Sequence, residues 1–178
     1  MAWEQDLAAL ARDRGSALVA YAYLLTGEMA SAQDLAQDAL VATFSRLRRP
    51  GADDVEHLEA YVRRAILHAF LNTRRRRDRW DGIARLVDDE RGRERSAPDA
   101  VAAARADVHA ALARLGARER ACVVLRHFED LPVRAIADRL DLSEGAVKRY
   151  LSDARRRLAP MLGSDDDTDV HLVEGARR

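Results

Sequence analysis

The sequence has few of the residues that stabilise small secreted, metal-bound or β-rich proteins. Its one cysteine, Cys122, excludes an internal disulfide framework and any zinc site built from several cysteines. Aromatic residues make up only 5% of the chain, and no stretch alternates β-branched with polar residues, which argues against sandwiches and barrels. No apolar run approaches the ~20 residues that span a bilayer, and Glu4 and Asp6 stand where a signal peptide has basic residues. These absences predict a cytoplasmic, all-α protein.

Neither sign of charge is in excess, because 30 basic residues balance 30 acidic ones over the 178 positions. The charges are nevertheless segregated along the chain. Residues 1–45 carry two arginines against six acids, whereas residues 60–80 carry seven arginines against one aspartate, and residues 145–162 carry five basic residues against Asp153. Two positive segments of this kind are typical of a protein that binds phosphates, although either one alone is equally compatible with a solvated helix face.

Catalytic patterns are missing from the sequence. The five histidines show no H-x-x-x-H spacing, and there is neither a glycine-rich phosphate loop nor a G-x-S-x-G elbow. Cys122 lies on an apolar helical segment with Val124 and Leu125, which indicates a structural thiol rather than a nucleophile. We therefore expect a protein that is not an enzyme and that needs neither a metal nor a cofactor.

Helical periodicity dominates the N-terminal half. Residues 16–25 predict a helix that stops at Gly27, and Ser31 is expected to cap the next one. Positions with i, i+3, i+4 spacing give that second helix a buried stripe: Ala32, Leu35, Ala36, Ala39, Leu40, Thr43, Phe44 and Leu47. The opposite face presents Gln33, Asp34, Gln37 and Asp38.

A third helix follows the break at Pro50 and Gly51 and an acidic loop. Its expected buried stripe is Leu58, Tyr61, Val62, Ala65, Ile66, Ala69 and Thr73. The other side carries Arg63, Arg64, His68 and Asn72 and continues into Arg74, Arg75, Arg76 and Arg77. Leu67 and Leu71 fall outside the stripe, so we expect the first helix to cover them.

Composition divides the chain into two small helical domains. Residues 81–99 combine glycine, proline and dense mixed charge with few apolar positions, which is typical of a linker. We therefore predict a domain at 1–80, a flexible linker at 81–99, a second domain at 100–162 and an acidic, disordered tail at 163–178.

The second domain ends in a helix-turn-helix pattern. One helix ends near Leu115 and Gly116, and the next carries Ala121, Val124, Leu125 and Phe128 on its inner side. Pro132 begins a further helix, and Ser143 caps the last one after a turn of three residues. On that last helix the outward positions suited to a DNA groove are Lys148, Arg149, Ser152, Arg155 and Arg156.

Three segments carry a family resemblance. The segment ARLGARERACVVLRHFEDLPVRAIADRLDLSEGAVKRYLSDARRRL resembles region 4 of the bacterial extracytoplasmic-function sigma factors, a group of the sigma-70 superfamily. YLLTGEMASAQDLAQDALVATFSRL is similar to region 2.2 of that family, and EAYVRRAILHAFLNTRRRR is similar to regions 2.3 to 2.4. Asp141 stands where the family has a turn glycine, and His68 and Asn72 stand where Asn and Asp are common.

The resemblance implies an alternative sigma factor that binds core RNA polymerase, at its clamp helices and flap, and promoter DNA, with an anti-sigma factor as a further partner. Polymerase contacts then fall on Asp34, Leu35, Gln37 and Asp38. Contacts to the −10 element fall on Arg48, Arg49, Arg63, Arg64, His68, Asn72, Arg74, Arg75 and Arg76. Contacts to the −35 element fall on Lys148, Arg149, Ser152, Arg155 and Arg156.

Two functions other than that of a sigma factor are compatible with the same sequence features. A stand-alone helix-turn-helix regulator that dimerises through its N-terminal helices would bind two half-sites about one helical turn apart without polymerase. An interaction protein that sequesters another regulator would make no sequence-specific DNA contact. Binding to polymerase separates the sigma-factor hypothesis from both.

Overall fold

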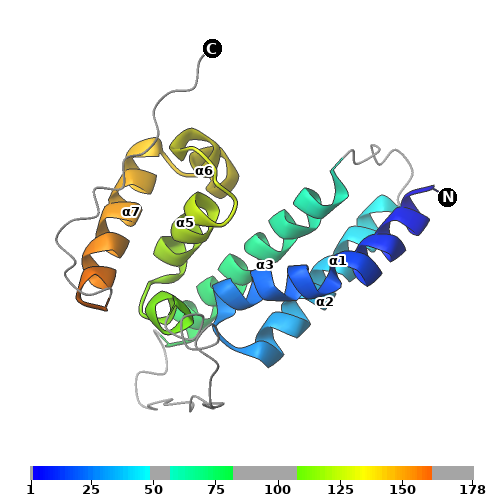
Figure 1. Cartoon of the computed structure of the whole chain (residues 1–178), viewed down its shortest axis with the longest axis horizontal. Coiled ribbons are helices and arrows are strands. Elements are labelled where there is room, and N and C mark those ends of the chain that lie inside the picture. The colour runs from blue at the N-terminus through cyan, green and yellow to red at the C-terminus, as the bar shows by residue number, and fades with distance from the viewer. Residues whose placement is uncertain (1, 49–56, 82–107, 162–178) are drawn as a thin grey trace.

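The chain is all-α throughout the residues that the computed structural model describes, which are 2–48, 57–81 and 108–161 (Figure 1). This agrees with the predicted fold class. Three long helices form one half of the molecule and several shorter helices form the other (Figure 1). None of the helices in these ranges is long and apolar enough to cross a membrane.

The first helix, α1 (Ala2–Thr26), is longer than the predicted segment but stops where the sequence indicated. Gly27 follows it with a φ of 75°, a left-handed conformation that glycine adopts without steric cost. The Gly27 N–H donates to the Tyr23 carbonyl at 2.9 Å, which closes the last turn. The chain can therefore reverse at once into the second helix.

The second helix, α2 (Met29–Leu47), begins before the predicted cap at Ser31, so that prediction was wrong. Glu28 is the N-cap residue, and the Ser31 hydroxyl donates to the Glu28 carboxylate instead of accepting from the backbone. Thr26 holds the preceding turn, because its hydroxyl donates to the Glu28 carbonyl at 3.1 Å. The turn after α1, rather than the serine, decides where α2 starts.

Most of the predicted stripe on α2 is buried, with one exception. Ala32, Ala36, Ala39, Thr43 and Leu47 lie in the interior, and the Thr43 hydroxyl donates to the Ala39 carbonyl at 2.7 Å. Phe44, in contrast, is 38% exposed and lies against the Arg48 guanidinium, whose central carbon is 5.6 Å from the ring centroid. Phe44 therefore belongs to the outer edge of α2.

The third helix, α3 (Leu58–Asp81), is buried on a face rotated from the predicted one. Val62 and Ile66 are buried as expected, and so is Leu67, which was expected to be covered by a further helix; Phe70 is buried as well, and Thr73 is exposed. The exposed Thr73 hydroxyl instead donates to the Ala69 carbonyl at 3.0 Å. The rotation arises because α3 contacts α5 of the other half as well as α1 and α2.

The second half consists of a helix over residues 108–113, α5 (Ala117–His127), α6 (Val133–Leu140), α7 (Glu144–Leu158) and a short 3-10 turn, η1 (Ala159–Met161). The Gly116 N–H donates to the Glu119 carboxylate at 2.9 Å, which fixes the start of α5. Pro132, predicted as the first helical residue, is instead the N-cap of α6, so the helix begins one position later, at Val133. Phe128, expected inside, is 47% exposed.

The helix-turn-helix forms as predicted. Asp141 ends α6 with φ 53° and ψ 53°, the left-handed conformation that aspartate tolerates better than most residues. The Ser143 side chain accepts from the Ala146 N–H at 3.2 Å and caps α7. Small Ala137 is buried on α6, and α6 packs against α7. The turn between these two helices is therefore specified by local sequence.

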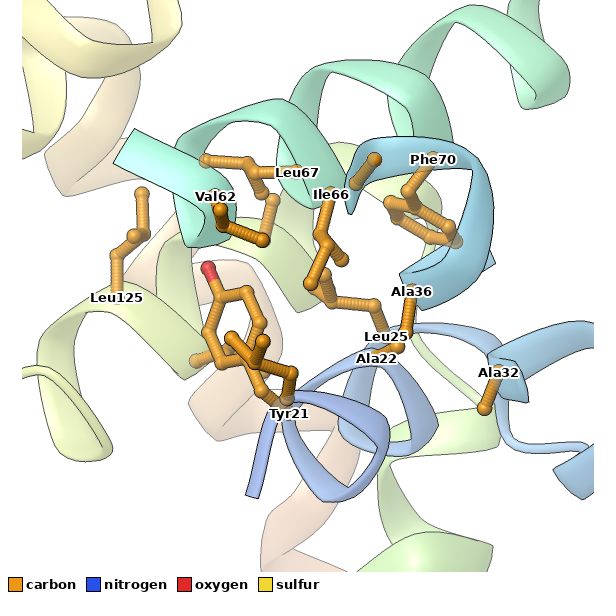
Figure 2. Close-up of a cluster of buried hydrophobic side chains, with 14 of the residues drawn as sticks. Tyr21, Ala22, Leu25, Ala32, Ala36, Val62, Ile66, Leu67, Phe70 and Leu125 are labelled. Atoms are coloured by element: carbon orange, nitrogen blue, oxygen red, sulfur yellow. The ribbon is translucent and has the colours of Figure 1, made fainter. Parts of the chain in front are cut away.

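The two halves share a buried core. Tyr21 and Leu25 of α1 and Val62 of α3 lie in the same apolar cluster as Leu125 of α5 and Val147 of α7. Figure 2 shows Leu125 on the side of the cluster where Tyr21 and Val62 lie. The predicted linker from 82 onward and the tail at 163–178 lie outside the described residues. Contact between the halves was not part of the sequence prediction.

Candidate nucleic-acid and polymerase interfaces

A polar, acidic face runs along the outside of α2. Asp34, Gln37 and Asp38 are exposed and Leu35 is half-buried beside them, as the periodicity predicted. Val41, which the sequence analysis did not select, extends this face by one turn and is 57% exposed. A carboxylate face with an exposed apolar residue suits a protein partner better than it suits DNA.

A cationic pocket of about 370 Å³ lies where the end of α2 meets α3. It is lined by Arg46, Tyr61, Arg64, Ala65 and His68. The central carbon of the Arg46 guanidinium is 5.8 Å from the Tyr61 ring centroid, within the range of a cation–π contact. An aromatic ring flanked by guanidinium groups provides a stacking surface for a nucleobase and donors for its phosphates.

The His68 imidazole lines this pocket, and its pKa lies below the ordinary value, which favours the neutral form. Burial lowers its pKa, and the neighbouring charges of Arg64 and Arg139 lower it further. A neutral imidazole has one N–H donor and one acceptor nitrogen. His68 is therefore suited to hydrogen bonding with a base edge, whereas the arginines are suited to phosphates.

The residues predicted for the −10 element are only partly brought together. Arg64 and His68 line the cationic pocket, and Asn72 is exposed one turn further along α3. Arg74 lies against Phe70, with its guanidinium carbon 6.0 Å from the ring centroid. Arg48 is exposed at the end of α2. Arg49 and the side chains of Arg75 and Arg76 lie outside the described part of the chain.

Arg63 faces away from the pocket. Its Nη2 donates to Glu59 at 2.6 Å, and its side chain is only 18% exposed. Glu59 also accepts two hydrogen bonds from Arg14, at 3.0 and 3.1 Å, and these bonds lower the pKa of the Glu59 carboxyl. Arg63 is thus engaged within the protein, in contrast to its predicted exposure.

The −35 candidates form one surface on α7. Val147 and Ala154 are buried beneath them, which turns the outward positions of the helix to solvent. All five predicted residues are exposed: Lys148, Arg149, Ser152, Arg155 and Arg156. Asp153 forms an ion pair with Arg156 on the same helix, so that part of the Arg156 charge is compensated. Figure 1 places α7 on the side of α5 away from α1–α3.

Cys122 is a buried thiol, as expected. It is fully buried on α5, and burial raises its pKa to about 12, so the reactive thiolate is not formed near neutral pH. Across the described ranges, no group of three or more His, Cys, Asp or Glu residues is placed to hold a metal ion.

Of the pocket residues, Arg64 and His68 were predicted from the sequence, whereas Arg46, Tyr61 and Ala65 were missed and had only a weak signal. Tyr61, Arg64, Ala65 and His68 follow i, i+3, i+4, i+7 spacing, so they share one face of α3. Tyr61 was assigned to the buried stripe because its spacing matches that of the apolar residues Leu58, Val62 and Ala65. Arg46 lies on another helix, and its proximity to Tyr61 depends on how α2 packs on α3.

Comparison with known families agrees with this arrangement. Residues 10–80 match the Sigma-70 region 2 family, and residues 105–158 match the Sigma-70, region 4 family. The RNA polymerase sigma-E factor of Streptomyces avermitilis is 34% identical over 171 residues, covering 94% of this chain and 90% of that protein. The ECF RNA polymerase sigma factor SigL of Mycobacterium tuberculosis is 30% identical, covering 84% and 85%.

A solved structure shares the fold. The sigma factor RpoE of Bartonella quintana, in a co-crystal with the anti-sigma factor NepR, superposes with a TM-score of 0.64 at 24% identity, covering 92% of this chain and 98% of that one. The fold is therefore that of a sigma factor.

The chain belongs to the extracytoplasmic-function sigma factors of the sigma-70 family. It is an alternative sigma factor, which binds core RNA polymerase and promoter DNA and directs promoter-specific transcription initiation. The comparisons do not favour a stand-alone helix-turn-helix regulator. Sigma factors are DNA-binding initiation factors.

Proposed function

We propose that the two halves divide promoter recognition, with residues 1–80 binding polymerase and the −10 element, and residues 100–162 reading the −35 element. Residues 81–99 would join them. The observation that supports this most strongly is the placement of two separate cationic surfaces, the α2–α3 pocket and the outer face of α7, on different halves. Two weak sites on one chain gain affinity together because the second contact becomes intramolecular.

The α2 face is the proposed polymerase contact. Asp34, Leu35, Gln37 and Asp38, extended by Val41, would dock on the clamp helices, and the second half would reach the flap. Complementary charge across such an interface gives specificity and speeds association. The exposed apolar Val41 would lie inside the buried part of the contact.

The α2–α3 pocket is the proposed site for a base of the opened −10 strand. Extruding a base costs a few kcal/mol, which stacking on an aromatic ring and phosphate contacts would offset. Tyr61 would stack on the base, Arg46 and Arg64 would hold the flanking phosphates, and neutral His68 would contact the base edge. Asn72 and the run Arg74, Arg75 and Arg76 would continue along the strand, with Arg48 and Arg49 at its other end.

The α7 helix is the proposed −35 reader. Its N-terminal half would enter the major groove, where Lys148, Arg149 and Ser152 reach base edges. Arg155 and Arg156 lie further along the helix and would bind phosphates. The pairing of Arg156 with Asp153 makes Arg155 the stronger phosphate ligand of the two.

The chain acts as a cytoplasmic initiation factor rather than as an enzyme, and it uses no cofactor. The Bartonella quintana relative was crystallised with an anti-sigma factor. We propose that a protein of that class also restrains this chain.

Reconstituted transcription tests the division of labour. Core polymerase with this chain is expected to initiate at a promoter that core polymerase alone ignores. Scrambling the −35 sequence should lower initiation, and an oligonucleotide pre-opened at −10 should rescue it in part, because the first half still holds the open strand. Equal transcripts with and without the chain, measured by primer extension, would contradict the proposal.

Two substitutions on α7 separate base reading from phosphate binding. We expect Arg149→Ala to relax base preference at one −35 position by about 1–3 kcal/mol, the value of a good bidentate contact. Arg155→Ala should weaken all sequences alike and reduce the slope of log K against log[salt] by about one charge. Duplex binding by the holoenzyme at several salt concentrations measures both. Identical effects from the two changes would contradict the proposed groove orientation of α7.

A further inference from the structure

Tyr150 occupies the border between the buried and the exposed face of α7. It lies three positions after Val147 and four before Ala154, both of which are buried, so helical spacing places it at the edge of the same stripe. Its side chain is half-buried and packs against the apolar cluster that contains Val147. The interior of the protein therefore fixes the position of the Tyr150 ring.

The guanidinium group of Arg149 lies over this ring. Its central carbon is 5.5 Å from the Tyr150 ring centroid, within the range of a cation–π contact, and Arg149 remains exposed. Within the described ranges, Arg149 is the only cation of the −35 surface that lies over an aromatic ring. Arg156 on the same surface is held by Asp153 instead. The ring contact thus distinguishes Arg149 from its cationic neighbours.

Stacking on a ring is compatible with base reading. A guanidinium group stacks through its flat face, which leaves the N–H groups at its edge free to donate. Two parallel N–H donors match the O6 and N7 acceptors that guanine presents in the major groove. Arg149 also lies in the N-terminal half of α7, the half that enters the groove in the proposed orientation. The stacked side chain therefore has the chemistry to read a guanine.

A side chain that is already ordered binds at a lower entropic cost than a mobile one. Arginine has several rotatable bonds, and ordering one such side chain at an interface weakens binding by roughly 2- to 12-fold. Contact with the fixed Tyr150 ring restricts the Arg149 guanidinium before DNA is bound. Part of the ordering cost is then met by the fold, and the saving applies to the base contact that Arg149 makes.

We infer that Tyr150 is a positioning residue for −35 recognition, whose ring holds Arg149 in the orientation that reads a guanine. The inference rests on the proposed −35 role of α7. Tyr150 acts through Arg149, so its contribution appears in base discrimination and not in the count of phosphate contacts. The ring is the part of Tyr150 that matters, and a phenylalanine at this position serves equally well.

The test compares Tyr150→Leu and Tyr150→Phe with wild type, each with Arg149 present and in an Arg149→Ala background. Holoenzyme is assembled with each full-length chain and selected on promoter-length duplexes that are randomised over the −35 region, and sequencing of the bound fraction gives the base preference at each position. Two duplexes that differ only at the selected guanine are then titrated at several salt concentrations. Leu158→Ala is the matched control, because it removes apolar contact from the same helix more than two turns away.

We expect Tyr150→Leu to lower affinity for the guanine duplex by about five-fold and affinity for the substituted duplex by less than about two-fold, so that discrimination falls. Tyr150→Phe and Leu158→Ala should keep the wild-type preference. The slope of log K against log[salt] should be the same in all variants that retain Arg149, since its charge is unchanged. In the Arg149→Ala background, Tyr150→Leu should have no further effect, because the two residues act as one unit.

An unchanged guanine preference in Tyr150→Leu would overturn the inference, as would an equal loss of affinity from this change with and without the Arg149 guanidinium. Far-UV circular dichroism checks that each variant is folded, and Tyr150→Met replaces Tyr150→Leu if the latter is not. If Arg149→Ala itself keeps the wild-type preference at every −35 position, the proposed −35 role of α7 fails, and the inference fails with it. A preference that depends on Arg149 but not on Tyr150 contradicts the inference alone, so the two failures are distinguishable.

Discussion

Reversing both carboxylates on the outer face of α2 is expected to abolish assembly with core polymerase. In the variant Asp34→Lys, Asp38→Lys, two positive charges replace the negative charges that we propose to face the clamp. Like charges brought together at an interface cost several kcal/mol, so the affinity for core polymerase should fall by at least about 100-fold. Both residues are exposed and lie one turn apart, so the fold itself should persist.

A matched control is available on the neighbouring helix. Asp6→Lys, Asp13→Lys on α1 makes the same change in net charge at two other exposed positions. Surface plasmon resonance with immobilised core polymerase should show binding like that of wild type for this control. If both double variants lose binding equally, the effect is one of net charge, and the α2 face is not the docking site. Val41→Glu provides an independent probe of the same face.

Removing the Tyr61 ring is expected to give the second large effect. Base stacking on an aromatic side chain contributes about 1–3 kcal/mol, so Tyr61→Ala should weaken holoenzyme binding to the −10 strand by roughly 5- to 150-fold. Tyr61→Phe keeps the ring and should bind within about two-fold of wild type. The holoenzyme is the species measured, because the chain acts on promoter DNA together with core polymerase.

Arg46 provides a second test of the same pocket. Arg46→Gln removes a guanidinium group beside the Tyr61 ring, so the salt slope of strand binding should fall by about one charge with little change in base preference. Competition between strands that differ at a single base measures the preference. For Tyr61, the contradicting result is that Tyr61→Ala and Tyr61→Phe lose the same affinity for the −10 strand. The ring would then not stack on a base, and the pocket would not be the −10 site.

Local sequence rules predicted some boundaries well and others poorly. Ser143 caps α7 as predicted, because its hydroxyl accepts from the Ala146 N–H. Ser31 looked equally suitable, but Thr26 and Glu28 arrange the chain reversal after Gly27 so that α2 begins earlier. A cap prediction therefore holds where the preceding turn is fixed by its own residues and fails where another interaction sets the turn.

The candidate sites followed the same pattern. The −35 surface was visible in the sequence because all of its residues lie on one helix, and the 3.6-residue period places them on one face. The −10 pocket could be predicted only in part. Tyr61, Arg64 and His68 share one face of α3, which the sequence period indicates, but Arg46 comes from α2 and only the packing brings it there. Arg63 shows the opposite error: the period placed it outside the stripe, and packing against Phe128 then covered it.

The sequence by itself determined an all-α chain with cations on the outer face of α7 and carboxylates on that of α2, because helical periodicity is a local property of neighbouring residues. Only the tertiary structure decided which apolar faces meet across the two halves. The hydrogen bond from Arg120 to Leu25 joins residues 95 positions apart, and no local rule relates them. A wide apolar stripe in the sequence shows that a helix must pack against other elements. Which elements pack against it depends on the shape and charge of the neighbouring helices.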